Sequence, residues 1–295
     1  MTAHAQNVAA PAPDDVGQRT LPAPYYADES CTIYCRDNVA TMQAAIPDAS
    51  IDLVVTSPPY DNLRTYGGHS WNFEGVAQQL WRTIKPGGVV VWVVNDETID
   101  GGETGSSFVQ ALGMMKAGFT LHDTMIYAKN GVRFPESNRY YPCWEYMFVF
   151  SSGKPKTTNL IADRKNACAG TSHVSGMERQ PNGKIRVPRR MTTFKEVGVR
   201  TSIWTYDVGK YKSTEDTFAF VHPATFPEAL ARDHILSWTN EGDTVLDPFS
   251  GSGTTIKMAR ACGRLGIGIE INPEYCEIAR KRLRQRVLNF DEVPA

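Results

Sequence analysis

Long apolar runs and a secretory leader are both missing from this 295-residue sequence. No apolar stretch reaches the roughly 18 residues that a membrane-spanning helix needs, so we expect no membrane span. Residues 1–24 are rich in Ala and Pro and lack a basic start followed by an apolar core. This composition argues against a signal peptide and predicts a disordered tail. We therefore expect a soluble, cytoplasmic protein of bacterial or phage origin, found with the nucleoid.

Paired cysteines and a strong net charge are also absent. The six cysteines include no CxxC pair, and no CxxC is followed by HxxxH. This spacing excludes the common zinc and disulfide frameworks, so we expect free thiols and no metal. The formal net charge of −1 neither favours nor excludes a nucleic-acid partner, so the distribution of charge matters more.

Apolar runs alternate with segments of helical spacing over most of the chain, which predicts a doubly wound α/β sheet. The run VVVWVV is typical of a strand that is buried on both faces of a parallel sheet. We expect strands at 31–35, 51–57, 89–94, 121–129, 145–151, 244–246 and 264–271, a turn at 85–88, and helices at 37–46, 71–84, 108–117, 226–239, 256–263 and 273–288.

Residues 152–205 interrupt this alternation. They are polar, show little periodicity and contain eleven Lys and Arg against three acidic residues, a net charge of +8. Such a local basic segment suits an anionic partner, and a solvated, partly disordered insertion is the alternative. We expect a tail at 1–24, an insertion at 152–216, and one domain formed by 25–151 and 217–295. A second basic run, residues 279–286, suits either a solvated helix face or contact with DNA.

A glycine-rich loop, DPFSGSGTT (247–255), lies between an expected strand and an expected helix. Its glycines allow a ligand to approach the backbone, and the helix start offers N–H groups. About twenty residues on, Glu270 ends the next strand, where an acid can accept hydrogen bonds from ribose hydroxyls. Asp247 suits the charged amino acid end of a ligand and would repel phosphate. Neither the GK[ST] of a P-loop nor a strict GxGxxG occurs, so an adenosyl amino acid fits best.

The stretch IDLVVTSPPYDN (51–62) contains a stiff tetrapeptide directly after an apolar strand. Pro58 and Pro59 have fixed φ angles and no N–H, so backbone carbonyls here can point at a ligand from the carboxyl edge of the sheet. An ordinary proline-rich turn is the alternative. Ser57 and the Pro58 carbonyl could accept hydrogen bonds from an amino group.

SPPY and DPFSGSGTT together resemble the motifs of the amino-methylating DNA methyltransferases. The resemblance spans about residues 30–150 and 217–288, and it includes VHPATFP (221–227), similar to a segment that helps hold the methionine moiety. SPPY precedes the cofactor loop, as in the β-class. The resemblance therefore implies a Rossmann-like, doubly wound methyltransferase sheet that is circularly permuted and carries an inserted target-recognition region. In that permuted sheet, strand 31–35 follows the strand that ends in Glu270.

The resemblance assigns S-adenosyl-L-methionine as cofactor and double-stranded DNA as partner. A homodimer and a separately acting cognate restriction endonuclease are further partners of such enzymes. The implied catalytic residues are Ser57, Pro58, Pro59 and Tyr60. The implied cofactor-binding residues are Asp37, Ser57, His222, Asp247, Pro248, Phe249, Gly251, Ser252, Gly253, Thr254, Thr255, Glu270 and Ile271. The implied DNA-binding residues are Lys184, Arg186, Arg189 and Arg190. For Asp37, expected near the adenine amino group, a helix cap is the alternative.

SPPY favours N4 of cytosine as the methyl acceptor in this family. Tyr60 would stack on the base after it has been flipped out of the duplex. Adenine N6 stays open, because a serine hydroxyl can accept from either amine. A non-catalytic DNA-binding protein on the same fold is the alternative from another class. Carbon-5 methylation would use Cys143 of the Pro142-Cys143 pair, but the surrounding sequence lacks the motifs of that family.

Overall fold

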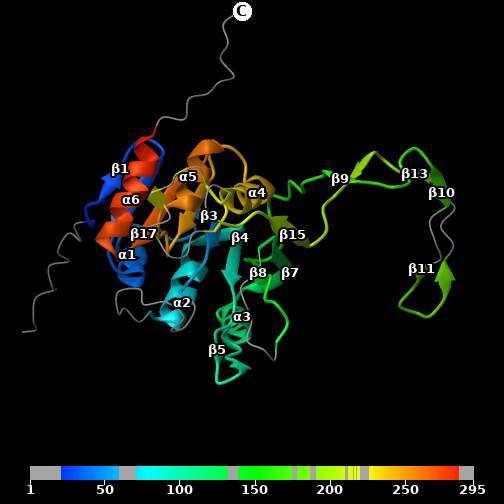
Figure 1. Cartoon of the computed structure of the whole chain (residues 1–295), viewed down its shortest axis with the longest axis horizontal. Coiled ribbons are helices and arrows are strands. Elements are labelled where there is room, and N and C mark those ends of the chain that lie inside the picture. Colours follow the sequence, from blue (N-terminus) through cyan, green and yellow to red (C-terminus); the bar gives the residue numbers. More distant parts are fainter. Residues whose placement is uncertain are drawn as a thin grey trace, which may run out of the picture.

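The computed structural model describes residues 21–59, 71–131, 139–174, 178–186, 191–209, 212–214, 216, 218–219 and 226–285. Most of the tail expected at 1–24 therefore lies outside the described residues. At the centre is a nine-stranded sheet in the order β1-β2-β17-β16-β3-β4-β8-β7-β15, in which β1 and β8 run antiparallel to the other strands (Figure 1).

The elements of this central body have the following bounds. The strands are β1 (Tyr26–Ala27), β2 (Cys31–Cys35), β3 (Ile51–Thr56), β4 (Ile84–Val94), β7 (Thr120–Lys129), β8 (Trp144–Ser151), β15 (Ile203–Tyr206), β16 (Thr244–Asp247) and β17 (Leu265–Glu270). The helices are α1 (Asn38–Ala45), α2 (Phe73–Thr83), α3 (Ser106–Lys116), α4 (Glu228–Trp238), α5 (Thr254–Ala261) and α6 (Pro273–Arg284). A short hairpin, β5 (Thr98–Ile99) with β6 (Gly102–Glu103), follows β4.

Helices cover both faces of the sheet, so the predicted doubly wound architecture is confirmed. On one face, Met42, Leu80 and Met114 from α1, α2 and α3 pack in a common core with Trp92 of β4. On the other face, α4 and α5 pack against β3, β4 and β16, while α6 packs against β2. All six residues of β3 are buried, which explains its uninterrupted apolar run. No described helix combines the length and the apolar character needed to cross a membrane.

The strand order confirms the circular permutation. β17 pairs in parallel with β2, so the last strand of the chain lies beside one of the first, with Glu270 opposite Cys35. β16 then connects β17 to β3, with Leu246 opposite Val54. Parallel neighbours end at the same edge of a sheet, and residues from both ends of the chain therefore meet there.

Two elements differ from the expectation. The turn expected at 85–88 instead belongs to β4, because Gly87 N donates to Ser152 O at 2.7 Å and Ser152 N donates to Gly88 O at 3.0 Å. These bonds draw the Gly-Gly pair into the sheet. β15, which lies inside the expected insertion, pairs in parallel with β7 as the outermost strand of the main sheet. Trp204 and Tyr206 are its buried residues.

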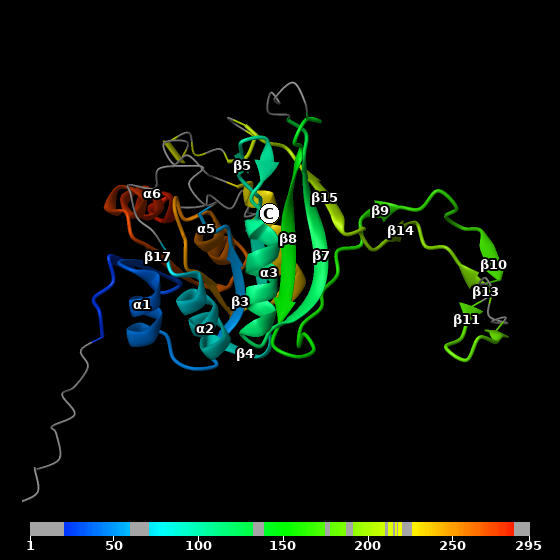
Figure 2. The ribbon, with the colours of Figure 1, turned by 90° about the horizontal axis from the view of Figure 1, so that it is seen from below.

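Residues 162–200 form a long antiparallel ribbon, here called the ribbon arm, that projects from the central body (Figures 1 and 2). Three short ladders follow one another along it. They pair β9 (Arg164–Lys165) with β14 (Val197–Gly198), β10 (Ser172–Val174) with β13 (Met191–Thr193), and β11 (Glu178–Arg179) with β12 (Ile185–Arg186). The ladders stand apart from the nine-stranded sheet, so the segment that appeared aperiodic in sequence folds mainly on itself.

Candidate active site

The expected cofactor and catalytic motifs meet at the carboxyl edge of four neighbouring parallel strands. Ser57 follows β3, the glycine-rich loop follows β16, Ile271 follows β17 and Asp37 follows β2. Of the expected catalytic and cofactor residues, Tyr60 and His222 lie outside the described residues.

Thr56, which the sequence argument did not single out, joins the SPP segment to the glycine-rich loop. Its Oγ1 donates a hydrogen bond of 2.7 Å to Oδ1 of Asp247, and both side chains are buried. Thr255 crosses in the other direction, because its Oγ1 donates to the carbonyl of Val55 at 3.0 Å. Two hydrogen bonds therefore fix the end of β3, and with it the half-buried Ser57, against the loop.

Asp247 is 1% exposed, and burial raises the pKa of its carboxyl to about 6. Hydrogen bonds from Thr56 and from the backbone N–H of Phe249 (3.1 Å) oppose that shift without cancelling it. A buried carboxylate of this kind favours a nearby cation, because opposite charge lowers the cost of its ionisation. The acid thus both shapes the loop and makes its surroundings unsuitable for phosphate.

Glu270 holds the opposite side of the loop. Its Oε2 accepts from the backbone N–H of Gly251 at 2.8 Å, and its Oε1 accepts from that of Asn272 at 2.8 Å. Gly251 has a φ of 49° and Gly253 one of 79°, in the left-handed region that favours glycine. The carboxylate therefore secures the tight path of the loop while it lies at the edge of the sheet.

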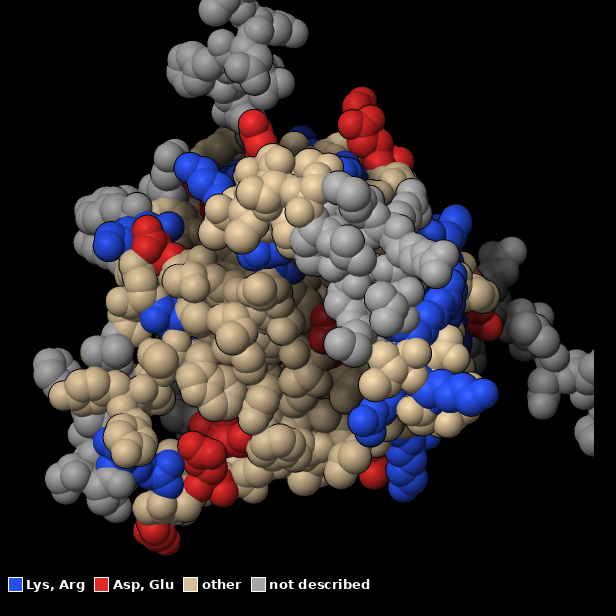
Figure 3. Space-filling model, turned by 90° about the vertical axis from the view of Figure 1, so that its right-hand side faces the viewer, with Lys and Arg blue, Asp and Glu red and all other residues tan. Residues whose placement is uncertain are grey.

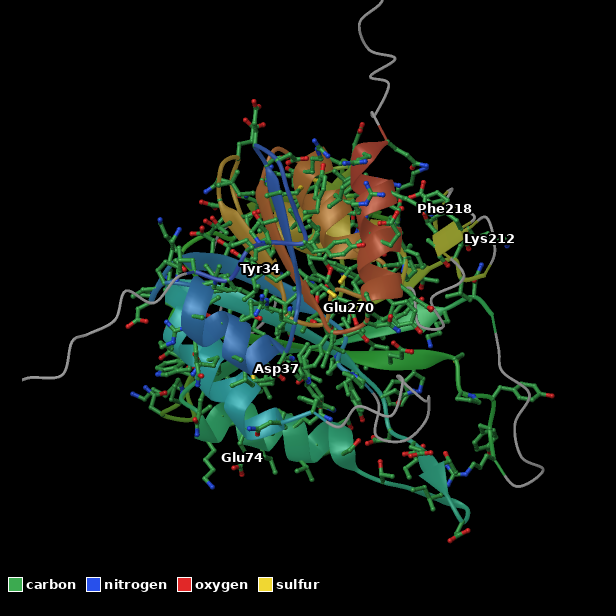
Figure 4. The ribbon with its side chains drawn as sticks, turned by 90° about the vertical axis from the view of Figure 1, so that its left-hand side faces the viewer. Tyr34, Asp37, Glu74, Lys212, Phe218 and Glu270 are labelled. Carbon is green, nitrogen blue, oxygen red and sulfur yellow. The ribbon has the colours of Figure 1, made fainter. Side chains whose placement is uncertain are left out.

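Asp37 begins α1, and its Oδ1 accepts from the N–H of Ala40 at 2.8 Å, so the helix cap weighed in the sequence argument is present. Figure 4 shows Asp37 and Glu270 at the ends of their neighbouring elements, with Tyr34 further along β2. Next to the cap, Asn38 Nδ2 donates to the carbonyl of Pro248 at 3.3 Å. This contact connects the start of α1 to the glycine-rich loop and was not expected.

An aromatic cluster anchors the ring of Phe249 beneath the site. The ring lies 5.1 Å from that of Trp71 and 6.2 Å from that of Trp92, with edge-to-face geometry in both pairs. Trp92 is itself fixed, since its Nε1 donates to Oε1 of Gln110 at 2.8 Å. The loop is thus pinned to the hydrophobic core at Phe249, directly after the motif's Asp-Pro.

Arg282 contacts the loop from α6, and neither interpretation of the basic run 279–286 holds for it. Its side chain is fully buried, and its Nη1 donates to the carbonyl of Ser252 at 2.9 Å and to Oγ1 of Thr254 at 2.9 Å. Helical spacing explains the difference, because Lys281 and Arg284 are exposed while Arg282 lies on the face toward the sheet.

The expected DNA-binding residues lie far out on the ribbon arm. Lys184 and Arg186 are exposed near its outer turn, and Arg189 and Arg190 lie outside the described residues. On the side of the molecule toward which the arm extends, Lys and Arg side chains surround a broad uncharged area (Figure 3). The arm itself carries nine Lys and Arg against three acidic residues.

An adenosyl amino acid fits the residues at this edge. Asp247 and Glu270 are both acidic and border one glycine-rich loop, which suits a ligand with a sulfonium and an ammonium group and disfavours a phosphate. The guanidinium behind the loop does not reverse this preference, because it is paired with the carboxylates of Asp216 and Glu228. The hydroxyl of Ser250 is buried without a hydrogen-bond partner among the described residues.

Comparison with known proteins agrees with this geometry. The orphan methyltransferase M.BamHII of Bacillus amyloliquefaciens is 57% identical over 248 residues, which cover 84% of this chain and 94% of the relative. The structure of the PvuII DNA methyltransferase (cytosine-N4-specific) has a similar fold, with a TM-score of 0.66, 20% identity and coverage of 90% of each chain.

A third similar protein is the DNA modification methylase TTHA0409 of Thermus thermophilus, solved in complex with S-adenosyl-L-methionine. It has a TM-score of 0.54 and 23% identity, covering 88% of this chain and 96% of that one. Residues 51–281 match the family described as DNA methylases, which comprises N6- and N4-type enzymes. This chain is therefore a member of the N6/N4 DNA methylase family.

Proposed function

We propose that this DNA methylase transfers a methyl group from S-adenosylmethionine to the exocyclic N4 amino group of cytosine in duplex DNA. The observation that carries the proposal is the union of the SPP segment and the glycine-rich loop. Thr56 and Asp247 join them through a buried hydrogen bond of 2.7 Å. Ser57 therefore lies at a fixed position beside the loop that suits the methyl donor.

Ser57 and Pro58 would act on the reacting nitrogen. The lone pair of an exocyclic amine is delocalised into the ring, which makes the nitrogen a poor nucleophile. Hydrogen-bond acceptance by the Ser57 hydroxyl and the Pro58 carbonyl draws the nitrogen toward tetrahedral geometry and aligns it for direct transfer. Tyr60, which lies outside the described residues, would stack on the flipped base.

S-adenosylmethionine would lie across the carboxyl edge, where it supplies an electrophilic methyl group. Glu270 would accept from the ribose hydroxyls, and Asp37 from the adenine amine. Each carboxylate oxygen has two lone pairs, so the backbone bonds to Glu270 and the cap at Asp37 leave acceptor capacity for a ligand. Asp247 would favour the cationic end. Pro248, Phe249, Gly251–Thr255 and Ile271 would complete the site, together with His222, which lies outside the described residues.

Cytosine is preferred to adenine because Ser57 is neutral and can both donate and accept. That capacity suits the cytosine amine beside its acceptor ring nitrogen. Adenine N6 is the second candidate, because the same hydroxyl can accept from that amine. Carbon-5 chemistry is disfavoured, since Cys143 precedes β8 and β4 separates that strand from β3.

The ribbon arm would bind the DNA. Its net charge of +6 is concentrated on a projecting structure, as expected for an element that contacts phosphates and reads a groove. Lys184 and Arg186, with Arg189 and Arg190, are the proposed contacts. A homodimer and a separately acting restriction endonuclease are further proposed partners, by analogy with restriction-modification enzymes.

Transfer of a labelled methyl group tests the proposal. The protein is incubated with methyl-labelled S-adenosylmethionine and DNA, and the DNA is digested to nucleosides. We expect label in N4-methylcytosine. Label in N6-methyladenine would move the target to adenine, and absence of label on every duplex DNA would favour a non-catalytic DNA-binding protein.

Substitution of Ser57 tests the role of the SPP segment. S57A should lower kcat by about 10²–10³-fold, because one preorganised hydrogen bond to the reacting group is lost. Its affinity for S-adenosylmethionine, measured by calorimetry, should change little. S50A is the matched control, since Ser50 lies at the opposite end of the same strand and bonds only locally, to Pro47 O at 2.7 Å. Equal activity of S57A and S50A would refute the assigned role.

A further inference from the structure

We infer that Arg282 positions the cofactor loop for S-adenosylmethionine and couples this loop to the chain that returns from the ribbon arm. The inference rests on the proposed site for the methyl donor. It adds a residue that, on the proposed geometry, acts through the loop and not by touching the ligand.

One guanidinium contacts both turns of the loop. Arg282 Nη1 donates to the carbonyl of Ser252 at 2.9 Å, to its hydroxyl at 3.2 Å and to Oγ1 of Thr254 at 2.9 Å. The helix behind the loop is in close contact as well, because a Cβ added at Gly253 would lie 2.8 Å from Cβ of Ala279. The path of the loop over residues 252–254 is therefore set by α6.

The same guanidinium takes part in a buried charge cluster, formed by Arg282, Lys257, Asp216 and Glu228. Arg282 Nε donates to Asp216 at 2.8 Å and Nη2 donates to Glu228 at 2.6 Å. Lys257 Nζ donates to the same two carboxylates at 2.7 and 2.9 Å. Two cations thus face two anions, and removal of one partner would leave buried charge uncompensated.

The cluster connects the loop to the chain between the ribbon arm and α4. Asp216 belongs to that chain, and Thr214 Oγ1 donates to the cluster's Glu228 at 2.6 Å. Figure 4 shows Lys212 and Phe218, from the same chain, beside α6. A shift of the returning chain would therefore act on Arg282, and a shift of Arg282 would act on the loop.

Glu270 and Arg282 hold the loop from opposite sides. Glu270 fixes Gly251, whereas Arg282 fixes Ser252 and Thr254. Only a planar fork can reach the loop and both carboxylates at once, so a lysine at 282 would keep the charge and lose part of the geometry. This distinction separates the positioning role from a simple need for positive charge.

Calorimetric titration of the full chain with S-adenosylmethionine tests the inference. R282K should weaken binding on the order of tenfold, the usual effect of losing a hydrogen bond from a charged group. R280K is the matched control on the same helix, since Arg280 pairs with Glu277 at its partly exposed surface. D216N, which touches no loop atom in the described network, should weaken binding in the same direction, and it covers the case in which R282K does not fold.

The coupling has its own readout. DNA binding is measured with and without S-adenosylhomocysteine, and we expect the product to tighten DNA binding in the parent and less so in R282K and D216N. An equal ratio of the two DNA affinities in parent and variants would overturn the coupling. A merely structural role would lower the unfolding temperature without altering this ratio.

E270Q separates the inference from the proposed site. If E270Q weakens S-adenosylmethionine binding and neither R282K nor D216N does, the inference fails and the site stands. If none of the three changes the affinity, the proposed position of the cofactor fails. Weakening by E270Q, R282K and D216N, with R280K equal to the parent, supports both.

Discussion

At the scale of single residues, Asp247 combines a position suited to a cation with an unfavourable charge. Burial raises the pKa of its carboxyl to about 6 from an ordinary 3.8. The folded protein therefore holds this proton to higher pH than the unfolded chain does. Folding becomes less favourable as pH rises from about 4 to about 6 and does not change further above that range, a total cost of about 3 kcal/mol.

D247N should remove this pH dependence. An asparagine keeps an oxygen that can accept from Thr56, so the variant should fold and be as stable as the parent at pH 5 or below and more stable at pH 8. Urea unfolding of both proteins from pH 4 to pH 8 measures the difference, in which the titration of all other groups cancels. A parent that gains stability relative to D247N as the pH rises would contradict the prediction. The variant should also bind S-adenosylmethionine more weakly.

At the scale of elements, the base of the ribbon arm is clamped to the central body by Arg200. Its guanidinium contacts Asp163 at 2.6 to 2.8 Å on the outgoing chain and Asp233 of α4 at 2.6 Å. Tyr206 of β15 donates to the same Asp233 at 2.9 Å. The direction of the arm relative to the sheet therefore depends on a few hydrogen bonds at one end.

R200M should release this clamp. We expect the KM for DNA to rise about tenfold, since a partly buried ion pair is lost, while the affinity for S-adenosylmethionine stays unchanged. R232M is the control, because Arg232 also pairs with Asp233 but is half exposed and does not contact the arm. Equal KM values for R200M and R232M would show that the clamp does not orient the arm.

The outer part of the arm should contribute to DNA binding through charge. Each phosphate contact adds about −0.9 to the slope of log affinity against log salt, so K184Q/R186Q should make this slope shallower by about 2. The measurement is a salt titration of DNA binding. K116Q, at the end of α3, is the control and should leave the slope unchanged. If the double variant keeps the parent's slope, the arm's outer turn does not contact phosphate.

The sequence allowed the central strands to be predicted because each is an apolar run with a clear end. β3 and β17 agree with the expected ranges to within one residue. β15 was missed because it has four residues in a polar segment, and only pairing with β7 makes it a strand. The start of β4 was read as a turn because Gly87 and Gly88 are typical turn residues. Their extended path depends on bonds to Ser152, which no local pattern reveals.

At the scale of the whole molecule, the order of two motifs was enough to predict the permuted sheet. SPPY and the glycine-rich loop carry their chemistry in consecutive residues, so they could be recognised directly. Arg282 could not, because its partners come from the loop, from α4 and α5, and from the chain after the ribbon arm. Its burial results from packing among distant segments, and a count of basic residues along a helix gives no sign of it.

The ribbon arm leaves and rejoins the central body at one place, where Arg200 N donates to the carbonyl of Ile161 at 3.0 Å. Its strands pair with one another, so its folding asks little of the nine-stranded sheet. Such an arrangement resembles a tool on a common handle. The chemistry of methyl transfer can stay constant while the arm diverges in length and sequence, and new target sequences can arise by exchange of one contiguous cassette between relatives.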